Sequence, residues 1–238
     1  MSTYKKLTLM VPTYKRIEWI ERFLSSAERM ADQIDNIEFV VCYNKKDLKT
    51  KEYLQTREWV AAHKLIEETT VQPNLSKYFN LMYDQTDCEV VSMLGDDMIF
   101  ETKGYDTALL NEINKYNGNG IFWCNDKYIA REKLCVNLFV TRDFVKCTGK
   151  DFMAPMFKAD MIDAVWFEVG RLTHNLHYLK DVIIHHKHST GIDAPFDYTF
   201  QRLVPLQKNA NSSFNQAVGK IYATIIAGNL IASGHGSW

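Results

Sequence analysis

The sequence has no long apolar run and no paired cysteine motif. No stretch approaches the ~20 consecutive apolar residues that a membrane-spanning helix needs, so we expect no transmembrane segment. The five cysteines are scattered and odd in number, and none forms a C-x-x-C pair. This pattern favours buried free thiols in a reducing cytoplasm over a disulfide framework. Residues 1–6 show no secretory signal, so the predicted location is cytoplasmic.

An excess of one charge is also missing. The chain holds 28 Lys and Arg against 29 Asp and Glu, a net charge of −1. This balance excludes the whole-domain basic character of a dedicated nucleic-acid binder, although it leaves room for a local basic groove. With 238 residues, 46% hydrophobic and 24% charged, and with no internal repeat, the chain is predicted to fold as one large body.

Three common catalytic motifs do not occur. The sequence contains neither a G-x-x-x-x-G-K-[ST] loop nor a G-x-G-x-x-G loop, and it has no G-x-S-x-G turn. Walker-type ATPases, Rossmann dehydrogenases and α/β-hydrolases therefore lose their main support.

What the first half does contain is an alternation of strand-like and helix-like segments. Apolar runs predict strands, and spacings of three and four predict helices between them. The strands are expected over 7–11, 37–43, 64–70 and 88–94, and the helices over 16–31, 47–63 and from position 75 onward. This order predicts an α/β fold with a mostly parallel sheet and helices on both faces. Ligands bind such sheets at the carboxyl ends of the strands. The candidate site residues are therefore those just after Val11, Val41 and Leu94.

The second half is less regular. Helices are expected over 104–116 and 160–176, and strands over 121–124, 134–140 and 181–185. The C-terminal tail is expected to be helical, with an apolar stripe from Phe214 to Ile226. Packing of this stripe on the core is favoured over dimerisation or membrane contact.

Two adjacent carboxylates, Asp96 and Asp97, follow the apolar run that ends at Leu94. Like charges so close together repel unless a cation or a hydrogen-bond donor compensates them. A divalent metal that bridges to phosphates is a common solution. The alternative is a turn that caps a following helix. The preceding strand favours the metal role.

Five of the seven histidines lie between positions 174 and 188. In a strand, His186 and His188 fall on one face and His185 on the other. Imidazole is a good ligand for Mn²⁺ or Zn²⁺, so one or both of His186 and His188 could complete a site begun by Asp97. The two earlier histidines of the group are expected to be surface or packed residues.

A third group of acidic residues lies in Asp160–Arg171, beside Trp166. A carboxylate against an apolar wall can keep a raised pKa and act as a general base, and Asp163 is one such candidate. On the residues alone, an acidic first turn that suits the helix dipole is the preferred interpretation.

In this order the motifs resemble the GT-A-fold glycosyltransferases, particularly the family-2 type, over about residues 7 to 190. The segments that carry the resemblance are Val11-Pro-Thr-Tyr-Lys-Arg16, Phe39-Val-Val-Cys-Tyr43, Gly95-Asp-Asp97, Asp163 with Trp166, and His186-Lys-His188. The resemblance implies a GT-A-type, Rossmann-like sheet in a single domain over 1–238. Within it, 1–100 would be the nucleotide-binding half, 101–192 the acceptor-binding half and 193–238 a helical extension.

The resemblance also implies a nucleotide pocket. Its members would be Pro12, Thr13, Tyr14, Arg16, Tyr43, Asn44, Lys77 and Asp96. Two departures stand out: Tyr43 and Asn44 occupy the place of an acidic residue that contacts the base or ribose, and Gly95 replaces another acidic residue. The identity of the base is therefore left open.

The remaining implied roles concern the metal and the base. Asp97 matches the metal-contacting residue of the D-x-D-like motif, and His186 or His188 matches a late metal ligand. Asp163 matches the general base of inverting members. The implied cofactor is a divalent metal, with Mn²⁺ expected before Mg²⁺.

The implied activity is transfer of a sugar, hexosyl or pentosyl, from a nucleotide sugar to an acceptor hydroxyl with inversion. UDP-sugar is the first expectation for the donor and GDP-sugar the second. One alternative is a nucleotidyltransferase on the same sheet, which would need a Gly-rich loop where Pro12-Thr-Tyr-Lys-Arg16 stands. Others are an inactive nucleotide-sugar-binding module and a metallohydrolase, which would need a compact H-x-H-x-D box.

The acceptor and the oligomeric state are left open by the sequence. Hydroxymethylated DNA is a candidate acceptor, since some compact phage transferases modify it, and the chain would then act in the host cytoplasm. The basic stretch Lys45–Lys51 could contact phosphates, or it could be a solvated helix face.

Overall fold

The structure is a computed structural model that describes residues 3–69, 74–127, 130–146, 149, 151–157, 161–187 and 213–235. Strands and helices alternate through its first half, as predicted. The strands are β1 (Leu7–Thr13), β2 (Ile37–Asn44), β3 (Ala62–Glu68), β4 (Val90–Met93), β5 (Met98–Phe100), β6 (Ile121–Asn125), β7 (Leu138–Thr141) and β8 (Leu176–His186). The helices are α1 (Ile17–Met30), α2 (Leu48–Thr56), α3 (Leu75–Gln85), α4 (Tyr105–Lys115), α5 (Arg142–Lys146), α6 (Ile162–Leu172) and α8 (Ser213–Ala232), with short 3₁₀ turns at Ile34–Asn36 and Arg131–Lys133.

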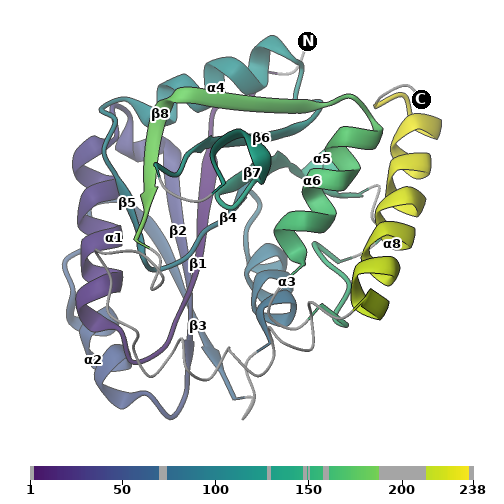
Figure 1. Cartoon of the computed structure of the whole chain (residues 1–238). Helices are drawn as coiled ribbons and strands as arrows, with labels where there is room; N and C mark the ends of the chain where they lie inside the picture. Colours follow the sequence, from purple (N-terminus) through teal and green to yellow (C-terminus); the bar gives the residue numbers. More distant parts are fainter. Residues whose placement is uncertain are drawn as a thin grey trace.

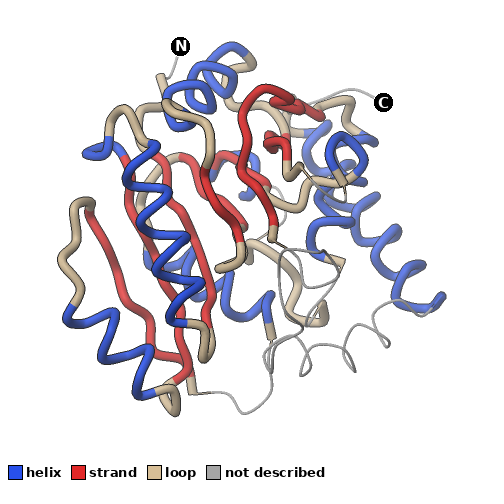
Figure 2. Tube along the Cα trace, turned by 60° about the vertical axis from the view of Figure 1, so that its left-hand side comes forward, coloured by secondary structure: helices blue, strands red, loops and turns tan. Residues whose placement is uncertain are grey.

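The described strands form one eight-stranded sheet in the order β3-β2-β1-β4-β7-β6-β8-β5. Figure 2 shows the strands in red and the helices in blue. The pairs β1–β2, β2–β3, β1–β4 and β6–β8 are parallel. β7 is antiparallel to both β4 and β6, and β5 is antiparallel to β8. The sheet is therefore mixed in its second half. Because β7 reverses direction between β4 and β6, strands β6 and β8 run the same way as β1–β4.

Helices cover both faces of the sheet, as predicted (Figure 1). Alternate residues of β1 point to opposite sides, so Leu9 and Val11 enter one apolar core and Met10 the other. α1, α2 and α4 pack in the first core, and α3, α5, α6 and α8 pack in the second. The carboxyl edge of the sheet thus lies between two buried layers.

The predicted helix over 47–63 is wrong in its second part. Asp47 caps α2 by accepting a hydrogen bond from the Thr50 amide (3.3 Å), but the helix ends at Thr56. Arg57 is extended, and its guanidinium pairs with Glu28. β3 then begins at Ala62 because its backbone pairs in parallel with β2.

The predicted helix over 160–176 is too long, and the predicted strand over 181–185 is too short. α6 ends at Leu172, where the chain turns at His174 (φ 55°) and the Asn175 amide donates to the Gly170 carbonyl (2.8 Å). A Cβ at Gly170 would lie 2.5 Å from the Leu176 side chain. This close approach lets β8 begin at Leu176, directly beside the end of the helix.

Several strand boundaries also differ from prediction. The first strand continues through Pro12 to Thr13, because β2 pairs with it as far as Thr13. The strand expected over 134–140 is the shorter β7, and the strand expected over 88–94 is the shorter β4. The turn after β4 leads into the short strand β5, which pairs with β8, so the alternative of a turn that caps a following helix is wrong.

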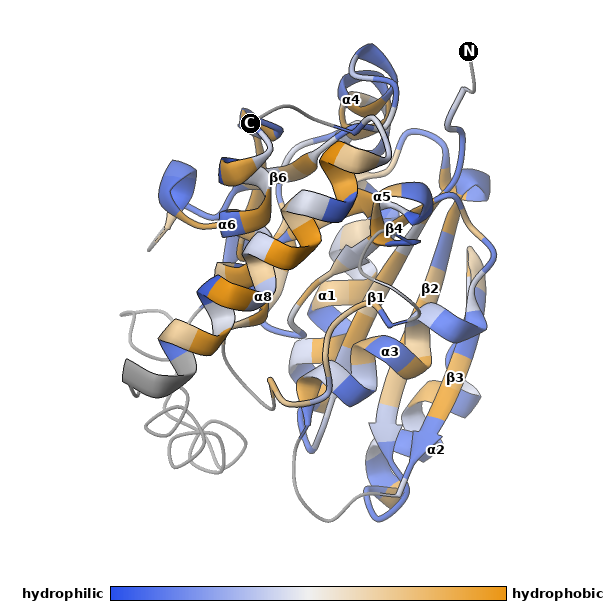
Figure 3. Ribbon diagram, turned by 90° about the vertical axis from the view of Figure 1, so that its right-hand side faces the viewer, coloured by the Kyte–Doolittle hydropathy of each residue, from blue (hydrophilic) through white to orange (hydrophobic). Residues whose placement is uncertain are grey.

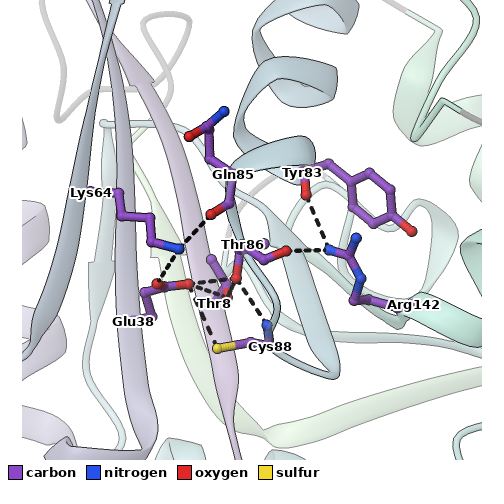
Figure 4. Close-up of polar contacts among 8 residues, drawn as sticks. All are labelled: Thr8, Glu38, Lys64, Tyr83, Gln85, Thr86, Cys88 and Arg142. Carbon is purple, nitrogen blue, oxygen red and sulfur yellow. Dashed lines mark hydrogen bonds and ion pairs between the residues drawn. The ribbon is translucent and has the colours of Figure 1, made fainter.

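A polar network at the amino ends of the strands joins α3 to the sheet (Figure 4). The Glu38 carboxylate accepts hydrogen bonds from Thr8 and Thr86 and pairs with Lys64 (3.2 Å). Arg142 Nη1 donates to the backbone carbonyls of Tyr83 (3.0 Å) and Thr86 (2.7 Å) at the end of α3. These bonds satisfy carbonyl groups that the helix itself leaves unpaired.

The C-terminal helix α8 packs along α6 (Figure 3). Ile226 and Leu230 are buried in the second core, whereas Ile221 and Ile225 remain 62% and 57% exposed. Core packing is therefore confirmed for part of the predicted stripe; the Phe214 side chain lies outside the described residues. Within the described ranges, no helix is long and apolar enough to cross a membrane.

The cysteines that the structure describes are free, as predicted. They are Cys42, Cys88, Cys124 and Cys135. Three of them are buried and Cys88 is half-buried, while Cys147 lies outside the described residues.

Candidate functional site

Polar side chains from several elements meet at the carboxyl edge of the sheet. β1 ends at Thr13, the turn after β4 carries Asp96 and Asp97, and β8 ends at His186. Asp163 lies in the first turn of α6. Parallel strand direction places these ends on one edge, the position where α/β sheets bind ligands.

Asp96 is held in place by two donors from β1 and the segment after it. Thr13 Oγ1 donates to Asp96 Oδ2 (2.8 Å), and Arg16 Nη1 donates to Asp96 Oδ1 (2.9 Å). The net pKa of Asp96 is raised to about 6. Burial is the largest cause, the charge of Arg16 lowers the pKa, and the charge of neighbouring Asp97 raises it. Arg16 therefore supplies part of the positive charge that the two adjacent carboxylates require.

Asp97 faces a histidine at the end of β8. Its Oδ1 lies 3.3 Å from His186 Nε2, and its Oδ2 lies 3.6 Å from Arg16 Nη1. The pairing of Met98 with His186 in the β5–β8 ladder sets this contact, and the Lys187 amide donates to the Asp97 carbonyl (2.9 Å). The structure therefore joins two of the residues predicted to bind metal.

His186 lies in a strongly acidic environment. Burial lowers the pKa of its imidazole, but the carboxylates of Asp97, Asp126 and Asp163 outweigh burial, and the net pKa is raised. His185, one residue earlier, points to the opposite face and bonds Glu101 through Nδ1 (2.8 Å). The alternate facing of the two histidines agrees with the sequence prediction, while His188 lies outside the described residues.

Asp163 is a half-buried residue whose carboxyl group is largely desolvated. Its Oδ1 accepts a hydrogen bond from the Ala164 amide (2.8 Å) at the start of α6. Desolvation raises the pKa of Asp163, while the Ala164 amide and the charge of His186 lower it, and the net effect is a rise. Such a carboxylate is a stronger proton acceptor than an exposed aspartate.

The first of the predicted nucleotide residues surround the ends of β1 and β2. Thr13 and Tyr43 are buried and paired in register, and Pro12 and Tyr14 are partly exposed. Burial raises the pKa of the Tyr43 phenol, and the charge of Glu67 raises it further.

Two other predicted nucleotide residues have local partners. Asn44 Oδ1 accepts a hydrogen bond from the Lys46 amide (3.0 Å), which closes the turn after β2. Lys77 Nζ pairs with Glu68 Oε1 (3.1 Å), and Glu68 is buried at the end of β3. Glu68 was missed by the sequence analysis, although it lies in the predicted strand over 64–70; in the structure it ends β3 as Asn44 ends β2.

Asp126 is a second residue that the sequence analysis missed. It is 1% exposed, follows β6, and acts on the charge state of His186. The available signal was its position two residues after the predicted strand over 121–124, which matches the position of Asp96 two residues after the predicted strand over 88–94.

The donor set of the site fits a divalent cation that is shared with phosphates. Within the described ranges, no three His, Cys, Asp or Glu side chains are grouped closely enough to hold a metal ion by themselves. Asp97 Oδ1 and His186 Nε2 lie 3.3 Å apart and offer one oxygen and one nitrogen ligand. Mn²⁺ and Mg²⁺ accept such ligands and take the others from phosphate oxygens and water.

Comparisons with known structures show similarity to solved glycosyltransferases. Residues 1–349 of TarS from S. aureus match with a TM-score of 0.61 and 13% identity, over 95% of this chain and 72% of that one. The same protein in complex with UDP-GlcNAc matches with a TM-score of 0.62 and 14% identity, over 95% and 73% of the two chains.

A third match is the mannosyltransferase PcManGT from Pyrobaculum calidifontis, solved with GDP-Man and Mn²⁺. Its TM-score is 0.62 at 14% identity, over 99% of this chain and 77% of that one. No family model and no curated protein matches the sequence. These similarities show that the chain has the GT-A-type glycosyltransferase fold.

Proposed function

We propose that this protein is a metal-dependent, inverting glycosyltransferase that uses a nucleotide sugar, with UDP-sugar as the first candidate donor. One observation carries the proposal. A carboxyl with a raised pKa, Asp163, lies within electrostatic range of the Asp97–His186 pair at the carboxyl edge of a GT-A-type sheet.

The donor side of the proposal rests on the ends of β1, β2 and β4. Thr13 and Arg16 fix Asp96, and Tyr43 lies beside Thr13 in the sheet. Solved proteins of the same fold bind UDP-GlcNAc in one case and GDP-Man with Mn²⁺ in another. A nucleoside diphosphate sugar bound at this edge would direct its diphosphate toward Asp97 and His186.

The reaction that we propose is a single displacement at the anomeric carbon. The acceptor hydroxyl attacks this carbon from the face opposite the diphosphate, and Asp163 takes the hydroxyl proton. The new carbon–oxygen bond forms as the bond to the diphosphate breaks, so the nucleoside diphosphate leaves with the electron pair and the configuration inverts. A divalent cation at Asp97 and His186 would neutralise the diphosphate and make it a better leaving group.

We further propose hydroxymethylated DNA as the first candidate acceptor. The turn after β2 and the start of α2 carry Lys45, Lys46 and Lys49, all exposed, on the same edge as the site. Ammonium groups in such a position can contact a phosphate backbone and release its counterions. No other acceptor is favoured by a specific feature of the described residues.

The test measures nucleoside diphosphate release from a panel of UDP- and GDP-sugars, with Mn²⁺ or with EDTA. Each reaction is run with hydroxymethylated DNA, with unmodified DNA of the same sequence and without DNA. Metal-dependent release from one donor supports the transferase, and stimulation by the hydroxymethylated DNA alone supports the acceptor. Nucleotide binding without release would instead indicate an inactive nucleotide-sugar-binding module.

A further inference from the structure

Asp126 is the first residue after β6, in the segment that leads to the 3₁₀ turn at Arg131–Lys133. Its two carboxylate oxygens accept hydrogen bonds from the backbone amides of Ala130 (3.1 Å) and Arg131 (2.8 Å). Trp123 Nε1 donates to the Arg131 carbonyl (2.7 Å) and joins the other end of the loop to β6. The Asp126 side chain is thus fixed by its own loop.

The same loop is joined to the end of β8. The His186 amide donates to the Asp126 backbone carbonyl (3.1 Å), while the next amide, that of Lys187, donates to the Asp97 carbonyl (2.9 Å). The end of β8 is therefore bound on one side to the loop after β6 and on the other to the turn after β4. His186 is the residue between these two attachments.

A second bridge holds the neighbouring residues. Glu101, which follows β5, pairs through one carboxylate oxygen with Lys127 and through the other with His185 Nδ1 (2.8 Å). Lys127 and His185 are the chain neighbours of Asp126 and His186. Two independent contacts therefore lock the same pair of segments together, one through the backbone and one through side chains.

We propose that Asp126 is a positioning residue, which holds His186 toward Asp97 and adds its negative charge to the cation site that the two form. The part that concerns the cation rests on the proposed function. Charged groups behind a metal ligand orient that ligand and strengthen metal binding, and their loss commonly costs 10-fold or more in metal affinity. The amides of Ala130 and Arg131 fix the Asp126 carboxylate in place, and its negative charge acts on His186.

The chain offers a matched control for this role. Asp106 is also fully buried, and its carboxylate also accepts two loop amides, those of Asp32 (2.9 Å) and Gln33 (2.8 Å). Asp126→Asn and Asp106→Asn each replace one acceptor oxygen by an amide group that cannot accept. The two variants should lose similar stability, but only Asp126 lies next to His186.

The experiment uses the full chain and two readouts. Hydrogen exchange, followed by NMR, reports the His186 and Lys187 amides, and electron paramagnetic resonance of free Mn²⁺ reports its affinity in the presence of UDP. We expect D126N to speed His186 exchange and to weaken Mn²⁺ binding about 10-fold relative to D106N. The Glu101→Gln variant should shift both readouts in the same direction and by less.

The possible outcomes separate this inference from the proposed function. Equal behaviour of D126N and D106N would overturn the positioning role, and so would faster exchange with unchanged Mn²⁺ affinity. If the wild type bound no Mn²⁺, the metal dependence of the proposed function would fail, and the exchange rates alone would decide whether Asp126 positions His186. If D126N did not fold, an unchanged E101Q would overturn the inference and a shifted E101Q would support it.

Discussion

The Arg16 guanidinium lies 2.9 Å from the Asp96 carboxylate and connects the segment after β1 to the turn after β4. Both side chains are largely buried, with 11% and 6% exposure. The Arg16 guanidinium therefore takes the place of water in compensating the charge of Asp96, and the ion pair orders the turn that also carries Asp97.

Removal of Arg16 should destabilise the protein more at pH 8 than at pH 5. The folded pKa of Asp96, about 6, is above its ordinary value of 3.8, so its contribution to stability falls as pH rises through this range. Arg16 lowers the pKa of Asp96 and thereby limits this loss of stability. In Arg16→Ala the carboxyl can take a proton at pH 5, but at pH 8 the variant must bury an uncompensated charge. We expect losses of about 3 kcal/mol at pH 8 and about 1 kcal/mol at pH 5, measured by urea unfolding.

An exposed ion pair is the control for this measurement. Arg171 bonds Glu168 on the surface of α6, where water screens the interaction. Arg171→Ala should leave unfolding unchanged at both pH values. A loss for Arg16→Ala that is the same at pH 5 and pH 8 would contradict the assignment of Arg16 as the counter-charge of Asp96.

Asp163→Asn should abolish transfer and preserve donor binding. The amide is nearly the same size as the carboxyl but cannot take the acceptor proton, so we expect a loss of about 10²- to 10⁴-fold in kcat. Calorimetry with the donor nucleotide should give an affinity within about twofold of the wild type. A variant that loses nucleotide affinity and keeps its kcat would exclude Asp163 as the base.

The acid side of the pH–rate profile should reflect the raised pKa of Asp163. Only the ionised carboxylate accepts a proton, so kcat/KM should increase with pH through that pKa. Because burial raises the pKa, the increase should occur at higher pH than for an ordinary aspartate. A profile that stays flat down to pH 4 would count against this assignment.

Asp97→Ala and His186→Ala should each remove the effect of Mn²⁺ on UDP binding. In the wild type, a cation shared between these residues and the diphosphate should tighten UDP binding. In the variants, the UDP affinity should be the same with Mn²⁺ as with EDTA. His63→Ala is a suitable control, since His63 stacks on Trp59 with ring centroids 4.2 Å apart near the start of β3. A wild-type-like Mn²⁺ response in both site variants would rule out the proposed ligands.

Arg142→Ala should destabilise the fold without a direct effect on the site. The guanidinium donates to two carbonyls at the end of α3 and lies 4.1 Å from the centre of the Tyr83 ring. Its loss leaves these carbonyls without their charged donor, and we expect a decrease of about 2 kcal/mol in the free energy of unfolding. Lys146→Ala, which removes an exposed ion pair with Asp143, should have no measurable effect. Equal stability of the two variants would show that the network is dispensable.

The local patterns of the sequence predicted the part of the fold that depends on neighbouring residues. Apolar runs marked β1 and β2, helical spacing marked α1 and α3, and the two carboxylates after β4 were placed at the ligand-binding edge. These features follow from periodicity and from residues close together in the chain. Helix ends were less predictable. α2 ends just before Arg57, whose guanidinium pairs with the distant Glu28, and α6 ends where Gly170 packs closely against Leu176 at the start of β8.

Only the tertiary structure decided which side chains meet. β7 reverses the sheet, β5 pairs with β8, and this pairing sets His186 beside Asp97. The partnership of Arg16 with Asp96 and the position of Asp126 behind His186 depend on the same non-local contacts. Strand order and register are settled by packing across the whole sheet, whereas the sequence by itself determined most of the strands and helices and the chemistry that they carry.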